Sequence, residues 1–203
     1  MHVVALANQK GGVGKTAITT NLGCLAAATG AIAVVLDLDH PQRSTMKWGA
    51  RREGDNPMVA EASASSLSKT LEAYREQGVA WTFLDLPGRV APAVAAGLRE
   101  AHLVLIPTRP TDVDLEAAAD VVAAAQRLRK PYAFVMSIAL QKRAEEFAEA
   151  LKKAGHKVCP IVITQKVAVH DALAGGLGVN ELAPRSTSAG EFAALFKWID
   201  KEV

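Results

Sequence analysis

The sequence has few cysteines and no long apolar run. Only two of its 203 residues are cysteines, Cys24 and Cys159, and neither lies in a CxxC pair or near clustered histidines. This spacing argues against a structural metal site and fits two reduced thiols. The longest apolar runs, such as AHLVLIP, are far shorter than the roughly 18 residues of a membrane span. The N-terminal MHVVALANQK also lacks the basic segment of a signal peptide, so we expect a cytosolic protein.

The sequence also lacks a strong excess of either charge. Lysine and arginine number 23 against 21 acidic residues, which gives a formal net charge of +2. This value does not by itself indicate a nucleic-acid-binding protein, although it allows a local basic patch. Half of the residues are hydrophobic and 22% are charged, as in soluble globular proteins. The length suits one domain, and we expect residues 1–203 to form it.

Strand-like and helix-like segments alternate along the chain. Apolar, strand-like segments lie at 2–8, 31–39, 57–62, 80–86, 102–107, 132–137 and 157–163. Segments with helical spacing lie at 15–29, 44–52, 66–77, 90–100, 112–129, 142–154, 168–176 and 187–202. The alternation predicts an α/β fold with a mostly parallel central sheet flanked by helices on both faces. Ligands of such folds bind beyond the carboxyl ends of the strands, so the residues after each strand matter most.

The first strand is followed by KGGVGKT, residues 10–16. Glycines between a strand and a helix let backbone N–H groups surround phosphates at the positive end of the helix. Lys15 is placed to reach the β- and γ-phosphates, and the Thr16 hydroxyl to ligate Mg²⁺. The strict pattern GxxxxGK[ST] is not met because Gln9 replaces the first glycine, and an extra lysine, Lys10, begins the loop. We interpret the segment as a variant phosphate-binding loop.

Acidic residues follow the second and third strong strands. Asp37 and Asp39 occur in DLDHPQRS, and Asp85 ends the strand in FLDLPG. Of the aspartate pair, one carboxylate can hold an Mg²⁺-bound water and the other can polarise the attacking water. Asp85 after an apolar strand is typical of a Walker B residue that orients Mg²⁺ through water. Pro87 and Gly88 would then turn the chain beside the γ-phosphate.

Together, KGGVGKT, DLDHPQRS and FLDLPG resemble the motifs of the ParA/MinD family of deviant Walker P-loop ATPases. Residues 106–122 and 174–199 are similar to further family segments, so the resemblance covers nearly the whole chain. It implies binding of ATP and Mg²⁺, with slow ATP hydrolysis. It also implies that Lys10 reaches the nucleotide of a second copy in an ATP-bound homodimer. One departure is His40, which lies between Asp39 and Pro41 where the family reads Asp-x-Asp-Pro-Gln. This extra residue either shifts the following loop and slows hydrolysis or is absorbed as a small bulge.

The resemblance assigns three groups of site residues. The expected catalytic residues are Lys10, Lys15 and Asp39, and the expected metal site comprises Thr16, Asp37 and Asp85. The expected cofactor-binding residues are Lys10, Gly11, Gly12, Val13, Gly14, Lys15, Thr16 and Ala17.

Other features separate the branches of this family. Cys24 and Cys159 fall within a helix and a strand of the predicted fold, which excludes an iron–sulfur branch. The last segment, EFAALFKWIDKEV, has an ordinary core-facing stripe at Phe192, Leu195, Phe196 and Ile199, so no membrane attachment is expected. The phosphate loop begins at residue 10, so we expect no preceding helix-turn-helix domain. No signal for the small-molecule pocket of ligase-like relatives is visible.

The remaining resemblance is to small ParA-type proteins. It implies an ATP-bound dimer that binds nucleoid DNA without sequence preference and segregates or positions a cargo, such as a plasmid, a chromosome origin or a protein assembly. A small adaptor, centromere-binding or cargo-linked protein would stimulate hydrolysis. Candidate DNA contacts are Lys142, Arg143, Lys152, Lys153, Lys166 and Arg185. A metabolic or regulatory P-loop enzyme and a MinD-like membrane-associated ATPase remain as alternatives on the same fold.

Overall fold

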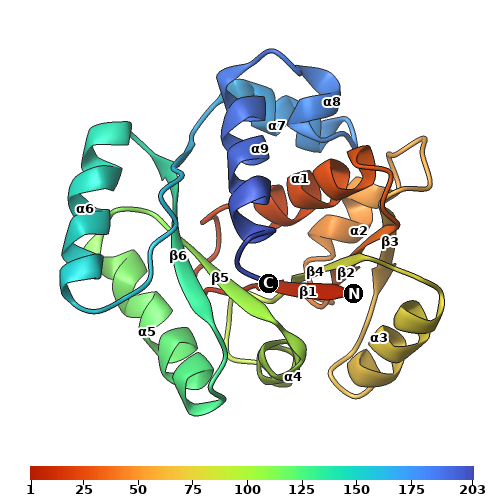
Figure 1. Cartoon of the computed structure of the whole chain (residues 1–203), viewed down its shortest axis with the longest axis horizontal. Coiled ribbons are helices and arrows are strands. Elements are labelled where there is room, and N and C mark those ends of the chain that lie inside the picture. The colour runs from red at the N-terminus through yellow and green to blue at the C-terminus, as the bar shows by residue number, and fades with distance from the viewer.

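The computed structural model describes all 203 residues, and its framework is one sheet of seven parallel strands (Figure 1). The strands are β1 His2–Leu6, β2 Ala33–Asp37, β3 Met58–Glu61, β4 Trp81–Asp85, β5 Leu103–Thr108, β6 Tyr132–Ala139 and β7 Ile163–Thr164. Their order across the sheet is β3-β2-β4-β1-β5-β6-β7. The first strand therefore lies in the middle, and its carboxyl end is flanked by the ends of β4 and β5.

Nine helices connect and cover the strands. They are α1 Lys15–Ala28, α2 Ser44–Gly49, α3 Leu67–Glu76, α4 Pro92–Glu100, α5 Asp112–Arg127, α6 Gln141–Lys153, α7 Val167–Ala174, α8 Val179–Leu182 and α9 Thr187–Ile199. None of them is long and apolar enough to cross a membrane.

The two faces of the sheet bury separate apolar clusters. Along β1, Val3 and Ala5 belong to a cluster of 28 buried residues, whereas Val4 and Leu6 belong to one of 19. Because successive side chains of a strand point to opposite faces, this division places one cluster on each side. The larger cluster includes residues of α3, α4, α5 and α6, and the smaller includes residues of α1, α7, α8 and α9. Helices thus cover both faces, which confirms the predicted fold class.

The last predicted strand is mostly wrong. Residues 157–163 were expected to form it, but β7 is only Ile163–Thr164, and Val158 makes an isolated bridge with Phe134. Pro160 explains the interruption, because proline has no N–H to continue a strand ladder. Cys159 therefore lies outside any strand, although it is buried like Cys24.

The C-terminal part also contains a short helix that the pattern did not indicate. This helix, α8, has four residues and lies between the two predicted helices α7 and α9. The predicted core-facing stripe of α9 is confirmed, since Phe192, Leu195 and Ile199 are fully buried and Phe196 packs against the same cluster.

Candidate functional site

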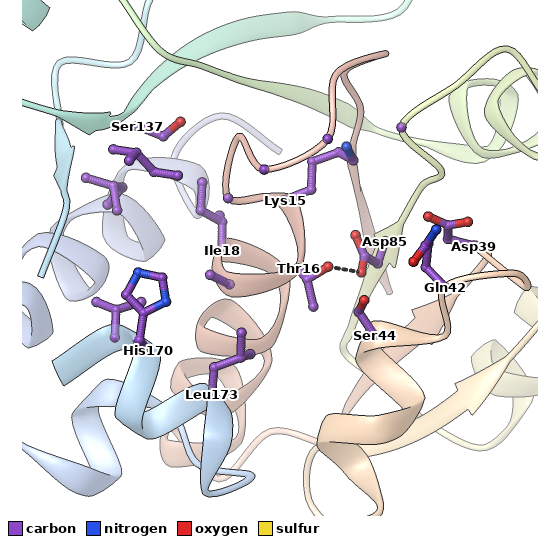
Figure 2. Close-up of a pocket in the computed structure, with 18 of the residues that line it drawn as sticks. Lys15, Thr16, Ile18, Asp39, Gln42, Ser44, Asp85, Ser137, His170 and Leu173 are labelled. Atoms are coloured by element: carbon purple, nitrogen blue, oxygen red, sulfur yellow. Dashed lines mark hydrogen bonds between the residues drawn. The ribbon is translucent and has the colours of Figure 1, made fainter. Parts of the chain in front are cut away.

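A cavity of about 580 Å³ opens at the carboxyl ends of the strands (Figure 2). The loop that follows β1 and the first turn of α1 form its centre, through Gly11, Gly12, Gly14, Lys15, Thr16 and Ala17. On one side of α1 the cavity reaches Asp39, Gln42 and Asp85, and on the other it reaches Ser137 and His170. Segments distant in sequence therefore meet around the start of α1.

Two glycines of the loop have backbone conformations that other residues avoid. Gly12 has φ +73°, and Gly14, which precedes the first residue of α1, has φ +86°. A Cβ atom on Gly11 or Gly12 would meet open space, so these two residues are bare backbone facing outward. The loop thus offers its N–H groups at the positive end of a 14-residue helix, which is a favourable place for an anion.

Val13 has a different position from its glycine neighbours. Its side chain is fully buried, and its carbonyl accepts a hydrogen bond of 2.8 Å from the hydroxyl of Ser137 on β6. Val13 does not line the cavity, so only its backbone is available to the expected ligand. Ser137, which sequence reasoning missed, fixes the loop to the neighbouring strand.

Lys15 is folded back onto its own loop. Its ammonium group donates to the carbonyls of Asn8 at 3.1 Å and Lys10 at 2.9 Å. Burial lowers the pKa of Lys15, while the carboxylates of Asp85 and Asp39 oppose this shift. Gly88, after β4, completes the enclosure, because a Cβ there would lie 3.1 Å from the Lys15 ammonium and 3.4 Å from the Gly11 nitrogen. The predicted turn at Gly88 thus passes directly over the loop.

Lys10 does not point into the cavity. Its ammonium lies 2.6 Å from a carboxylate oxygen of Asp114, a fully buried side chain in the first turn of α5. Arg109 also donates to Asp114, at 2.6 Å. Although burial alone would raise it, these two cations hold the pKa of Asp114 below its usual value. Lys10 is therefore paired within its own chain, yet 30% of its side chain stays exposed.

Asp85 joins two hydroxyl groups. One of its carboxylate oxygens accepts hydrogen bonds of 2.7 Å from Thr16 and from Thr45, a buried residue of α2 that the motif reading did not single out. Burial raises the pKa of Asp85 to about 6, against the effect of the two hydrogen bonds. A carboxylate beside a hydroxyl is a suitable pair of oxygen ligands for Mg²⁺.

Asp37 and Asp39 have separate roles in the structure. Asp37 is buried, and its two oxygens accept from the backbone N–H groups of Asp39 at 2.9 Å and Met46 at 3.1 Å. Burial raises the pKa of Asp37. Asp39 is half-buried and lines the cavity, whereas Asp37 does not. Asp37 thus shapes the loop that presents Asp39, and a contact between Asp37 and a metal stays a prediction.

The extra residue His40 is accommodated in a turn. The N–H groups of Gln42 and Arg43 donate to the carbonyl of Asp39, at 3.0 and 2.8 Å. His40 is exposed and, like Arg43, lies near Glu61 at the end of β3. Asp39 lines the cavity in this arrangement, and an effect of His40 on hydrolysis stays a prediction.

The side of the cavity away from Asp39 is largely apolar. Its walls include Ile18, Ile138, Leu173 and Phe192, with the polar side chains of Gln165 and His170 at its margin. None of these residues belongs to KGGVGKT, DLDHPQRS or FLDLPG, because the walls come from α1, β6, α7, α9 and the segment before α7, which only the fold brings together. The cavity therefore combines a polar part, around the glycine loop and Asp85, with an apolar cleft beside Ile18.

The parallel sheet, the glycine loop at the start of α1 and the adjoining carboxylates define a P-loop nucleotide-binding protein. A family model for the CobQ/CobB/MinD/ParA nucleotide binding domain matches residues 4–179. The chain belongs to this family.

Three curated relatives align with this chain, and the names of two of them refer to chromosome partitioning or carboxysome distribution. Protein ParA of Rhizobium radiobacter is 29% identical over 205 residues, which cover 98% of this chain and 83% of that protein. The chromosome-partitioning ATPase Soj of Thermus thermophilus is 26% identical, with 95% and 92% covered. The maintenance of carboxysome distribution protein A of Gloeobacter kilaueensis is 34% identical over a shorter match, with 60% and 55% covered.

Solved structures share the fold at lower identity. The MinD cell division protein of Aquifex aeolicus superposes with a TM-score of 0.81 at 16% identity, covering all of this chain and 98% of that one. The septum site-determining protein MinD of Pyrococcus horikoshii, solved as a complex with Mg-ADP, gives a TM-score of 0.76 at 14% identity, with 98% and 96% covered.

Proposed function

We propose that this chain is a ParA-type ATPase that forms a dimer when ATP is bound and positions or segregates a cargo. Residues 1–203 would form one P-loop ATPase domain, because the strands of a single sheet extend from His2 to Thr164. The observation that carries the proposal is Lys10: a partly exposed lysine begins the phosphate loop but points away from its own cavity. The ammonium group in that position can contact the nucleotide of a second copy more readily than the nucleotide bound by its own chain.

The residues of the cavity fit a magnesium nucleotide. The volume of about 580 Å³ lies within the range of small-molecule sites, roughly 300–1,000 Å³. The loop N–H groups and Lys15 suit the phosphates, and the apolar cleft beside Ile18 suits a base. Thr16 and Asp85 supply oxygen ligands of the kind that Mg²⁺ prefers. When bound, Mg²⁺ would offset the negative charge of the β- and γ-phosphates.

The chain's own residues would then divide the work of hydrolysis. Lys15 leaves the carbonyls of Asn8 and Lys10 and donates to the phosphates instead. Asp39 lines the cavity and orients the water that attacks, accepting a hydrogen bond from it. Thr45 holds the Asp85 carboxylate through its hydroxyl, at 2.7 Å. Because Asp39 stands on a loop rather than on a strand, we expect slow hydrolysis without a partner protein that fixes this loop.

On dimerisation, Lys10 would leave the Asp114 carboxylate and pair with the phosphates bound by the second copy. In the single chain Asp114 neutralises Lys10, and in the dimer the phosphates of the second copy would replace that carboxylate. Two copies that face each other with bound triphosphates would otherwise repel, so a lysine that crosses between them offsets the repulsion. The names of the relatives support this type of function, because they refer to partitioning and distribution.

Light scattering in an Asp39→Ala background tests the dimer. This change should retain bound ATP, so dimers should appear with Mg-ATP and disappear with ADP. Adding Lys10→Ala should return monomers, since the charge between the copies is lost. Asp114→Asn is the matched control, because it frees Lys10 without removing it and should leave the dimer at least as strong. Dimers that form equally well without ATP, or without Lys10, would contradict the proposed function.

A further inference from the structure

Large hydrophobic side chains are exposed near the carboxyl ends of the strands, where the cavity opens. Val90 after β4, Val113 in the first turn of α5 and Leu140 after β6 are 80%, 61% and 82% exposed. We refer to these three residues as the apolar rim. They are half of the six exposed large hydrophobic residues of the protein. Scattered exposed apolar residues are normal, but their gathering at this end of the sheet calls for an explanation.

Contacts between the loops hold the rim against the phosphate loop. Gly88, two residues before Val90, packs against the backbone of Lys10 and Gly11. Lys10 is paired with Asp114, which directly follows Val113. Farther along, the Arg143 side chain donates to the carbonyl of Pro110 at 3.1 Å, which joins the start of α6 beside Leu140 to the loop before α5. The rim and the phosphate loop therefore form one connected surface.

The charges around the rim favour a second copy of the same chain as the occupant. Arg89, Asp112 and Lys142 adjoin Val90, Val113 and Leu140 in sequence, and all three are exposed. A rim of one sign would repel its own copy, whereas a rim with both signs can pair with itself about a two-fold axis. The same surface carries Lys10, whose ammonium group does not line the cavity of its own chain.

We propose that Val90, Val113 and Leu140 form the apolar contact between the two copies of the ATP-bound dimer. This inference rests on the dimer of the proposed function. Each copy places its rim against the other, and the three side chains lose their water there. The rim supplies association that does not depend on charge, while Lys10 and the nucleotide supply the part that does. The dimer should therefore persist better at high salt than one held by Lys10 alone.

Sedimentation with Mg-ATPγS tests this contact without relying on Asp39. The variants are Val90→Glu, Val113→Glu and Leu140→Glu, each measured over a series of protein concentrations. Each should weaken dimerisation by at least about tenfold, while nucleotide affinity of the monomer stays within about twofold of the parent. Ile32→Glu is the matched control. Ile32 is 46% exposed but lies before β2, at the amino ends of the strands and away from the cavity.

The outcomes separate the rim from the dimer itself. If the parent dimerises with ATPγS and all three rim variants do so equally well, the rim serves another partner and the inference is wrong, although the proposed function stands. If Ile32→Glu weakens the dimer as much as the rim variants do, the effect is not specific to the rim, which also overturns the inference. A parent that stays monomeric would instead refute the proposed function, and the rim contact with it.

Discussion

At the scale of single residues, Lys15 and Asp39 line one cavity but should control different quantities. Lys15 reaches the phosphates in the ground state, whereas Asp39 is expected to act on the attacking water. Asp39→Ala should therefore lower the hydrolysis rate by at least about 100-fold while ATP affinity changes little. Lys15→Ala should instead abolish binding. Calorimetry with phosphate-release kinetics measures both quantities.

The same measurements check the assignment of Asp39. Asp37 is the neighbouring carboxylate, but its oxygens accept from the backbone N–H groups of Asp39 and Met46. If Asp39→Ala hydrolysed ATP normally while Asp37→Ala kept its fold and did not, the extra His40 would have moved the catalytic register by two residues.

The Asp85 carboxylate is suited to bind Mg²⁺, but its burial lowers the folding stability of the protein. Burial raises its pKa from 3.8 to about 6, so the folded chain binds more protons than the unfolded chain between these values. Folding stability therefore falls as the pH rises through this window, by up to about 3 kcal/mol for a shift of roughly two units. Asp85→Asn removes this penalty.

Asp85→Asn should raise the melting temperature of the nucleotide-free protein at pH 8, and the gain should fade below about pH 4. The variant should also lose Mg²⁺-dependent nucleotide binding. In the parent, that binding should weaken as the pH falls through about 6, because protonated Asp85 is a poor ligand. Thermal scans and titrations across this range measure both effects. A variant less stable than the parent at pH 8 would contradict this account.

At the scale of elements, a buried arginine joins the segment after α2 to the region of α8. Arg52 donates to both oxygens of Glu181, at 3.0 and 2.9 Å, and to the carbonyl of Gly176 at 2.9 Å. Its guanidinium also lies 4.8 Å from the centre of the Trp48 ring. These contacts tie the C-terminal helices to the segment that carries Thr45.

Removing the Arg52 side chain should lower the free energy of unfolding by more than removing a surface charge does. Arg52→Ala leaves Glu181 without its partner, and 31% of the Glu181 side chain is exposed, so we expect the free energy of unfolding to fall by about 2–3 kcal/mol, less than for a fully buried pair. Arg99→Ala is the control, because Arg99 is exposed, and its effect should stay within about 0.5 kcal/mol. Urea titration measures the two changes. Equal effects would mean that Arg52 acts only as a surface charge.

The elements show why some of the fold was readable in the sequence and some was not. Strands such as β1 and β4 are largely apolar and lead into the glycine loop and the Asp85 motif, so pattern and chemistry agree. The segment at 157–163 has the apolar composition of a strand, but Pro160 interrupts its pairing. Asn8, Thr45 and Ser137 belong to the site through single hydrogen bonds that depend on the fold, and no spacing rule indicates them.

At the scale of the whole molecule, the candidate DNA contacts lie in several places. Lys142 and Arg143 begin α6, Lys152 and Lys153 end it, and Lys166 precedes α7. Lys152 is paired with Glu149, and Arg143 with the carbonyl of Pro110. One chain therefore offers few free cations on any one surface, and a dimer would double the number of those that lie outside the rim contact.

Duplex DNA should accordingly bind to the ATP-bound dimer, without sequence preference. The logarithm of affinity should fall with the logarithm of salt concentration, with a slope of about −0.9 per phosphate neutralised. Mobility shifts with unrelated duplexes in ATP and in ADP measure this. Equal binding in ADP would remove the nucleotide switch, and no binding beside an intact ATPase would favour the metabolic or membrane-associated alternatives.

The central position of β1 has a consequence for how nucleotide release can be controlled. The phosphate loop continues from a strand with neighbours on both sides, and amides in such a strand exchange with solvent only when most of the fold opens. Partial melting of the molecule therefore leaves the floor of the cavity intact. A partner protein that speeds turnover would have to act on the walls instead, and these include two segments outside any strand or helix, 39–43 after β2 and 86–91 after β4.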